Sequence, residues 1–316
     1  MAANQQSKTT LQIRIAACSY NVKNKSSTDV VSMPLENWLL GDKETIDSKK
    51  KEAYKDVDIY AVGFQEVDDP TIGSIIDDKS LGHMVLQNSI QKILTKVGIY
   101  KCLISVELQK KRLYIFIKEC LFKYVANVSA DAIDVSPRTT PSSKGAVFVR
   151  FLLHSTSFAF ACSHQTAFEN RLLERNKNII EIAKNLSSPY AIDLHSHDYV
   201  IWLGDLNYRL EMPKETAEKL AVHTNWPELL KYDRLERSRE PDGISQDYQE
   251  ANITFLSQEQ RVLVRKRKKN LTYNSIYYGS AKLRTSDHRP VILIFDIDVL
   301  PLDESKIQVA AVATNS

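Results

Sequence analysis

Short runs of β-branched and aromatic residues recur along this chain, and most of them end in a polar cluster. Residues 11–17, 57–64, 158–162 and 199–203 have the length and composition of buried strands. Each run is followed by Asn, Gln, Glu, His or Asp, and a fifth run, 291–297, instead follows such a cluster. A polar strand end is ordinary by itself. Because a buried sheet holds the residues at its rim rigidly, five such ends together indicate a pre-organised functional site.

Two longer segments have the spacing of amphipathic helices. Residues 85–97 and 172–186 each place large apolar side chains on one helical face. Since strands and helices interleave along the chain, we expect an α/β or α+β fold with sheet at its centre. The 316 residues are 43% hydrophobic, which excludes a disordered chain and permits one large domain or two small ones.

Charge and cysteine usage limit the classes of function. A net charge of +3 does not indicate a nucleic-acid binder. No apolar run reaches the roughly 18–20 residues of a membrane span, and the N-terminus lacks the apolar core of a signal peptide. Cys18, Cys102, Cys120 and Cys162 form no CxxC pair, which disfavours a zinc site or a disulfide framework. We therefore expect a cytoplasmic monomer without a nucleic-acid partner.

Four residues after the apolar runs have the chemistry of a metal-assisted hydrolase. Glu66 and Asn21 offer hard oxygen ligands, and a site with few carboxylates and several open positions suits Mg²⁺. Asp205 and Asn207 are two residues apart, so they face the same side of an extended backbone. A carboxylate beside an amide is suited to activating and orienting a water molecule.

Two histidines extend this set. His288 directly follows Asp287, and a carboxylate can fix and charge an imidazole that stabilises a phosphoryl oxygen. His164 adds a second donor. Together these groups predict metal-assisted hydrolysis of a phosphate ester without a covalent intermediate. The chain contains neither a Cys-x5-Arg loop for a cysteinyl-phosphate route nor a GxxxxGK[ST] nucleotide-binding loop.

Six motifs, in this order along the chain, resemble those of the inositol polyphosphate 5-phosphatases. They are SYNV, DIYAVGFQEV, SKGAVFVRF, ACSHQTAFENRLLERN, IWLGDLNYRLE and RTSDHRPV. The resemblance covers roughly residues 11–299. GDLNYR followed by SDHRPV is a specific signal, whereas either motif alone also fits the wider endonuclease/exonuclease/phosphatase superfamily.

The resemblance implies a fold and an activity. The fold is an α/β (α+β) sandwich of two packed, mostly antiparallel sheets flanked by helices, with one catalytic domain over 11–300, a flexible N-terminus over 1–10 and a tail over 301–316. The activity is Mg²⁺-dependent removal of the 5-phosphate from phosphoinositides or soluble inositol phosphates. The resemblance assigns the metal to Glu66 and Asn21, water activation and orientation to Asp205 and Asn207, the scissile phosphate to His164 and His288 with support from Asp287, and substrate binding to Lys144, Arg209, Arg175 and Asn176.

The chain departs from the family between residues 252 and 263. A PTYKY-type segment is absent, and a PAWCDR-type motif survives only as 259–263, with Gln260 in place of the family's aspartate. In the family the missing stretch contacts the neighbouring 4-phosphate, and each charge-assisted hydrogen bond contributes about 1.5–3 kcal/mol. This loss predicts weakened activity, while the retained metal and water groups predict that hydrolysis survives.

A basic run follows at 261–269. Its six cations are Arg261, Arg265, Lys266, Arg267, Lys268 and Lys269. The run has four interpretations: it replaces the missing phosphate contacts, it touches an anionic membrane peripherally, it is a solvated hairpin or edge strand, or it is a nuclear-localisation signal. Three functions also stay open: an active 5-phosphatase, a protein that binds phosphoinositides without turnover, and another phosphodiesterase or nuclease of the superfamily.

Overall fold

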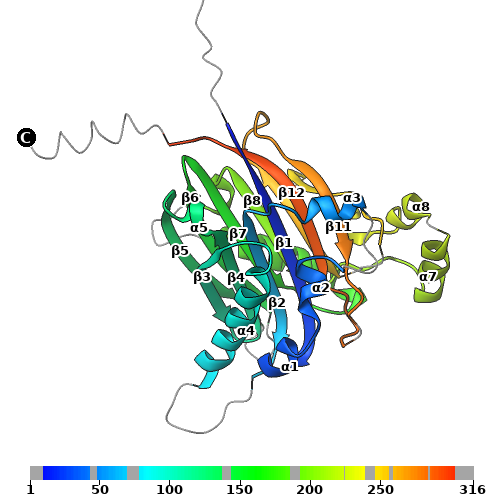
Figure 1. Cartoon of the computed structure of the whole chain (residues 1–316). Helices are drawn as coiled ribbons and strands as arrows, with labels where there is room; N and C mark the ends of the chain where they lie inside the picture. Colours follow the sequence, from blue (N-terminus) through cyan, green and yellow to red (C-terminus); the bar gives the residue numbers. More distant parts are fainter. Residues whose placement is uncertain are drawn as a thin grey trace, which may run out of the picture.

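The computed structural model describes residues 10–42, 48–69, 78–136, 144–185, 193–223, 225–238, 246–255, 259–283 and 285–302. The expected flexible N-terminus and C-terminal tail lie almost wholly outside these residues. Within them the chain forms two six-stranded sheets packed face to face and flanked by helices (Figure 1). The predicted sandwich is therefore confirmed.

The first sheet has the strand order β11-β12-β1-β2-β4-β3. Its strands are β1 (Leu11–Lys25), β2 (Ile59–Val67), β3 (Tyr100–Leu108), β4 (Lys111–Lys118), β11 (Asn274–Ser280) and β12 (Val291–Val299). The second sheet has the order β5-β6-β7-β8-β10-β9. Its strands are β5 (Val125–Asp134), β6 (Gly145–Leu153), β7 (Thr156–His164), β8 (Tyr199–Asp205), β9 (Tyr248–Glu250) and β10 (Gln260–Lys266). All five apolar runs predicted to be strands are strands.

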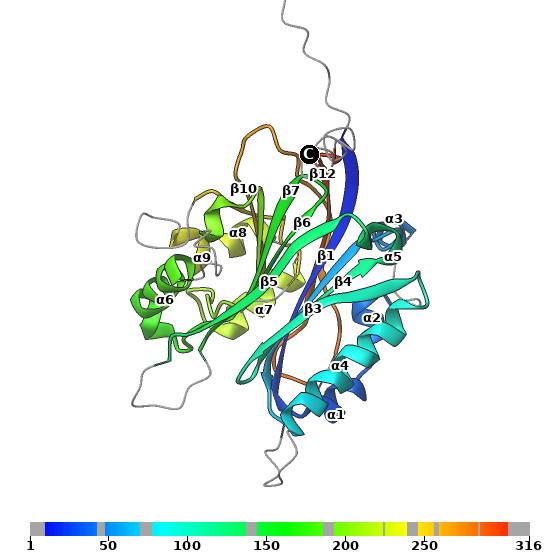
Figure 2. The ribbon, with the colours of Figure 1, turned by 90° about the vertical axis from the view of Figure 1, so that its left-hand side faces the viewer.

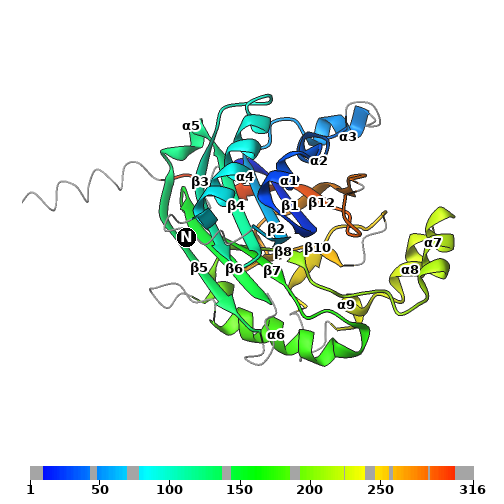
Figure 3. The ribbon, with the colours of Figure 1, turned by 90° about the horizontal axis from the view of Figure 1, so that it is seen from below.

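One parallel pair sits at the centre of each sheet. β1 runs parallel to β2, and β7 runs parallel to β8, whereas the other pairings in the described sheets are antiparallel. Parallel neighbours finish at the same edge of a sheet, so the C-terminal ends of β1 and β2 adjoin, and those of β7 and β8 also adjoin. Figure 3 looks at the end of the sandwich where these strands finish. The parallel pairs thus gather the polar clusters that follow the strands.

Alternation along the strands divides the apolar residues between an inner and an outer layer. In β1, Ile13, Ile15 and Ala17 belong to the core between the sheets, whereas Ala16 and Cys18 belong to a second core outside the first sheet. Figure 2 shows helices on both outer faces. The first sheet carries α1 (Ser27–Val31), α2 (Leu35–Leu39), α3 (Ser48–Ala53), α4 (Asp78–Leu94) and α5 (Glu119–Phe122), and the second carries α6 (Leu172–Asn185) and α9 (Arg234–Arg237). α7 (Lys214–Val222) and α8 (Trp226–Leu230) contact each other and project from the side of the molecule (Figures 1 and 3).

The two predicted helices exist, but each differs from its prediction in one respect. α4 ends at Leu94, and Val97 lies beyond it with 48% of its surface exposed. In α6, Leu173 is 75% exposed instead of buried, while Arg175 is fully buried. The inner face of α6 is therefore partly polar, because its buried polar side chains have bonding partners that the apolar spacing did not reveal.

The basic run begins inside the second sheet. Arg261 lies on β10 and is only 3% exposed, because its guanidinium is buried between Asp233 and Glu250. Its predicted membrane contact is therefore wrong. Arg265 and Lys266 are half-buried and donate to backbone carbonyls, which leaves three cations of the run exposed: Arg267, Lys268 and Lys269.

The exposed part of the basic run lies at the end of the sandwich opposite the polar clusters. β10 is antiparallel to β8, with Gln260 opposite Asp205 and Lys266 opposite Tyr199. Six residue steps along a strand span about 20 Å. The run therefore cannot replace phosphate contacts at the clustered strand ends. Leu11 and Val299 pair with each other at this same far end. No helix in the described ranges is long and apolar enough to cross a membrane.

Candidate active site

The two sheets meet through a hydrogen bond between predicted site residues. Asn21 stands opposite Gln65 across β1 and β2, and His164 stands opposite Asp205 across β7 and β8. Asn21 Nδ2 donates to Asp205 Oδ2 at 2.8 Å, and both side chains are buried. This bond links the central strands of opposite sheets, so it brings the polar clusters into one site.

Asp205 and Asn207 are held by a tight turn. β8 ends at Asp205, and Asn207 has a positive φ of 54°, so the expected extended geometry is wrong and the turn supplies their proximity. Asn207 N donates to Asp205 Oδ1 at 3.1 Å, and Asn207 Nδ2 donates to the carbonyl of Gln165 at 2.9 Å. Gly204 has φ +143°, and a Cβ there would lie 2.1 Å from the Ser163 carbonyl oxygen. Only glycine fits before Asp205 without displacing the backbone.

Asp205 lies between two imidazoles. Its Oδ2 is 3.7 Å from His164 Nε2 and 3.8 Å from His288 Nδ1, and the residue is 1% exposed. A buried carboxylate needs compensating donors, and here Asn21 and the Asn207 backbone supply them. The three side chains predicted to share the phosphate chemistry are therefore brought together.

His164 is held neutral. Burial lowers its pKa to about 3, since it penalises the imidazolium, and the nearby cations Lys144 and Lys111 lower it further against the pull of Asp205. Lys144 Nζ lies 2.6 Å from His164 Nε2, so the ammonium donates to the unprotonated ring nitrogen. Burial lowers the pKa of Lys144 as well, while Asp205 and Glu66 raise it. Lys144 therefore lies against His164 at the edge of the site, and its binding to substrate stays a prediction.

His288 is held charged, and its main partner was not predicted. Its Nδ1 lies 3.0 Å from Glu259 Oε2, and Glu259 Oε1 lies 2.8 Å from Arg209 Nη2. Burial opposes the charge on His288, but the close Glu259 carboxylate, together with Asp205 and Asp287, raises its pKa to about 9. Asp287 is 57% exposed, pairs with Lys23 at 2.9 Å and lies 3.9 Å from His288 Nε2. The predicted support from Asp287 is thus the weaker contact.

The loop that carries His288 is tied to β1. Ser286 Oγ donates to the Asn21 carbonyl at 2.9 Å and accepts from the His288 backbone N–H at 3.1 Å. This serine, which lies in the RTSDHRPV motif, bridges two predicted site residues, although no role was predicted for it. The bridge fixes the loop beside the strand that holds Asn21.

Glu66 occupies a strained position near the end of β2. It has φ +59°, which is unusual for a residue other than glycine, and such strain clusters at functional sites. Its Oε1 lies 3.7 Å from His164 Nε2, and Asn21 Oδ1 accepts from the Lys23 backbone N–H at 2.9 Å. No group of three or more His, Cys, Asp or Glu side chains arranged for a metal occurs in the described ranges. The donors here are carboxylate and amide oxygens, and this donor set fits Mg²⁺.

Two residues expected to bind substrate lie beneath the site instead. Arg175 is fully buried and donates to the backbone carbonyls of Thr166 and Phe168 at 3.3 Å and 2.6 Å. Asn176 is 9% exposed and accepts from the Tyr208 hydroxyl at 2.6 Å. The structure corrects the expected substrate contact for both, because their polar atoms hold the loop after β7 and the residue after Asn207.

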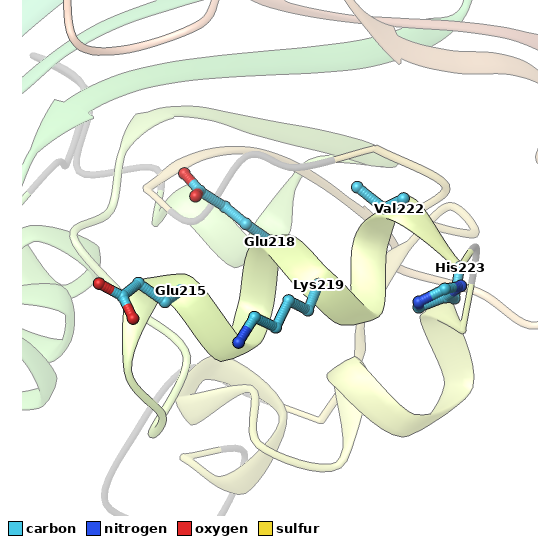
Figure 4. A pocket seen from close by; sticks show the side chains of 5 residues that line it. All are labelled: Glu215, Glu218, Lys219, Val222 and His223. Carbon is cyan, nitrogen blue, oxygen red and sulfur yellow. The ribbon is translucent and has the colours of Figure 1, made fainter.

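A separate shallow hollow of about 330 Å³ lies along α7. Figure 4 shows the side chains of five residues that line it: Glu215, Glu218, Lys219, Val222 and His223. Figures 1 and 3 both place α7 at the outer side of the molecule. None of the clustered strand-end residues lines this hollow, so it is distinct from the site around Asp205.

Curated relatives align with most of this chain but are much longer. Human Synaptojanin-1 is 29% identical over 348 aligned residues, which cover 94% of this chain and 22% of that protein. Inositol-1,4,5-trisphosphate 5-phosphatase 1 of Schizosaccharomyces pombe is 26% identical over 320 residues, which cover 93% of this chain and 28% of that protein. The chain thus spans less than a third of the length of these relatives.

Solved structures with different names share the fold. The inositol polyphosphate 5-phosphatase domain of SPsynaptojanin, in complex with inositol (1,4)-bisphosphate and calcium ion, matches with a TM-score of 0.77 and 24% identity over 95% of this chain and 89% of that one. Cimex nitrophorin, as its ferrous NO complex, matches with a TM-score of 0.67 and 18% identity over 91% of this chain and 99% of that one. Since one fold serves both proteins, the fold alone does not decide function.

The family comparison covers the whole of the site. Residues 18–294 match the family described as Endonuclease/Exonuclease/phosphatase family 2. These residues run from before Asn21 to beyond His288, so they include every side chain placed around Asp205. Because the match takes in most of the sequence, the chain belongs to endonuclease/exonuclease/phosphatase family 2.

Proposed function

We propose that the chain is a Mg²⁺-dependent phosphatase that removes the 5-phosphate of phosphoinositides or soluble inositol polyphosphates by direct attack of an activated water. The observation that best supports this proposal is the pair of imidazoles around one buried carboxylate. Asp205 lies within 4 Å of a neutral His164 and a charged His288. Titratable groups whose environments separate their pKa values are typical of acid–base sites. The 5-phosphate specificity is supported by the name of the Schizosaccharomyces pombe relative, Inositol-1,4,5-trisphosphate 5-phosphatase 1.

Each side chain has a role that its contacts support. Asp205 accepts the proton of the attacking water, because its carboxylate is buried and fixed by Asn21 and Asn207. The His288 imidazolium donates to a phosphoryl oxygen as negative charge develops. Lys144, which lies against His164, adds a second positive charge to the site.

Glu66 and Asn21 would hold the Mg²⁺, which supplies Lewis-acid polarisation of the phosphate and charge neutralisation. Glu66 offers a carboxylate at the rim and Asn21 an amide oxygen. The remaining positions stay open to water and substrate oxygens, which is usual for this ion.

The test is phosphate release by the purified chain with Mg²⁺. The substrates are a soluble inositol trisphosphate and a 4,5-bisphosphate phosphoinositide in vesicles, so that the two sources of the same headgroup are compared. Asp205→Asn and His288→Ala are each expected to lower kcat by about 100-fold or more, since one base or one charged donor contributes at least that much. Metal-independent release, or release unaffected by either substitution, would refute the assignment.

A second candidate is a protein that binds phosphoinositides without hydrolysing them. It is favoured by the short connection between β9 and β10, since Glu250 and Gln260 are only ten residues apart. This is the region of the sequence from which the family's 4-phosphate-binding segment is missing. Vesicle binding without phosphate release in the same assay would support this candidate over the first.

The exposed cations of the basic run do not bring the site to a membrane in this proposal. Arg267, Lys268 and Lys269 are exposed, but they lie at the far end of β10 from Asp205. A bilayer held there would face away from the site. We therefore expect Lys268→Ala to leave vesicle turnover unchanged.

A cytoplasmic, monomeric protein remains part of the proposal. The cytoplasmic location is supported by Cys18, Cys102, Cys120 and Cys162, which are all free thiols. Reducing compartments keep thiols in this state. Size-exclusion chromatography with light scattering tests the monomer, and imaging of the tagged chain in cells tests the compartment.

A further inference from the structure

Glu259 lies at the junction of three parts of the site. Its carbonyl accepts from the Leu206 backbone N–H at 2.9 Å, which ties it to the turn that follows Asp205. Its side chain extends in the other direction, with Oε2 3.0 Å from His288 Nδ1 and Oε1 2.8 Å from Arg209 Nη2. Main chain and side chain are therefore both anchored, so the carboxylate is fixed from two sides.

The other carboxylates near His288 are less well placed to orient it. Asp205 Oδ2 is 3.8 Å from Nδ1 and already accepts a bond from Asn21. Asp287 Oδ1 is 3.9 Å from Nε2, and this carboxylate is exposed and paired with Lys23. Among the carboxylates near His288 in the described ranges, Glu259 makes the closest ion pair with a ring nitrogen, at 3.0 Å against 3.8 Å and 3.9 Å for Asp205 and Asp287.

The neighbouring residue in the sequence does not share this role. Gln260 begins β10, and its Oε1 accepts from Ser19 Oγ at 2.7 Å inside the sandwich. Glu259 lies just before the strand, and its side chain is directed to His288 and Arg209 instead. The carboxylate beside His288 therefore comes from Glu259, one position before the residue that stands where the family has its aspartate.

We propose that Glu259 is the positioning residue of His288: it holds the ring through Nδ1 and leaves Nε2 to donate to the phosphate. Only the donation from Nε2 to the phosphate rests on the proposed function. The contact between Glu259 and Nδ1 does not depend on turnover. Arg209 completes the arrangement by pairing with the second oxygen of Glu259. A carboxylate fixed in this way keeps the imidazole charged and in one orientation.

The direct test is the NMR titration of His288 in the metal-free protein. The charged groups that face the ring are Asp205 from β8, Asp287 with Lys23 beside it, and Glu259 with Arg209 beside it. Glu259→Gln is isosteric and removes one charge, and Asp287→Asn is the matched comparison. We expect Glu259→Gln to lower the pKa of His288 by more than one unit and Asp287→Asn to lower it by clearly less. Glu259→Asp restores the charge and is expected to recover part of the shift.

Kinetics then separate positioning from a structural role. Glu259→Gln is expected to reduce kcat at least tenfold with little change in KM, and to move the alkaline limit of the pH profile downward by the amount seen in the titration. An unchanged titration in Glu259→Gln, or a larger shift in Asp287→Asn, overturns the inference whatever the activity is. If the wild type releases no phosphate while the titration behaves as expected, the proposed function fails and the positioning of His288 stands.

Discussion

Replacing Arg261 with methionine is expected to destabilise the fold strongly. Arg261 Nη2 lies 2.6 Å from Asp233 Oδ2 and 2.6 Å from Glu250 Oε2, and all three side chains are at most 3% exposed. Methionine fills much of the space but leaves two buried carboxylates without their cation. Breaking a buried pair by removing one partner costs about 3–5 kcal/mol. We expect the free energy of unfolding to fall by about this amount.

Urea unfolding measures this loss, with Lys268→Met as the control for the same chemical change at an exposed position. The control is expected to stay within about 0.5 kcal/mol of the wild type. Burial raises the pKa of Glu250 although Arg261 opposes it. A carboxyl whose pKa is higher in the folded than in the unfolded state binds its proton more tightly when folded, so lowering the pH favours folding. Removing Arg261 raises the pKa of Glu250 further, so protonation at low pH stabilises the variant more than the wild type. The loss in free energy of unfolding caused by Arg261→Met should therefore be smaller at pH 5 than at pH 7. Equal small losses in both variants, or a deficit that grows at low pH, would refute this reasoning.

Three further outcomes follow from the geometry of the site. Gly204→Ala is expected to lower the free energy of unfolding by about 1–3 kcal/mol from backbone strain alone, and the contact of the new Cβ with the Ser163 carbonyl adds to this loss. Urea unfolding measures the loss, and a value below about 0.5 kcal/mol would contradict the expectation. The pKa of His288 rises from 6.5 to about 9 on folding, so its charge favours the folded state fully below pH 6.5 and the benefit disappears as the pH rises through 9. The stability difference between wild type and His288→Gln should therefore fall by about 3 kcal/mol between pH 6 and pH 10, and a constant difference would exclude this origin. Chelation with EDTA is expected to abolish phosphate release and excess Mg²⁺ to restore it, whereas full activity in EDTA would exclude the metal.

The central strands could be predicted because their signal is local. Buried runs such as those of β2 and β8 are apolar on both faces, and this pattern is visible in the sequence. β5 was not predicted, because it lies at a sheet edge and most of its residues are exposed or half-buried. β5 is a strand because it pairs with β6, and this pairing cannot be read from the residues of β5 alone.

The site could be predicted only where a residue's chemistry is local too. Asp205 and His288 stand out in short polar clusters next to apolar strands. Glu259 and Arg261 do not, because what each does is set by partners distant in the sequence: Glu259 contacts His288, whereas the cation of Arg261 is neutralised in the interior by Asp233 and Glu250. A run of charges in a sequence therefore does not show which of its members reach the solvent.

The pairing of Leu11 with Val299 has a practical consequence. Both residues lie at the end of the sandwich opposite Asp205, since β1 and β12 run antiparallel and the site forms where β1 finishes. A biotin handle or a fluorescent protein joined beyond either strand is therefore attached on the rear of the molecule. Immobilised on a sensor chip in this way, the protein would present the face that holds Asp205 to the flowing solution, where both vesicles and soluble inositol phosphates can reach it.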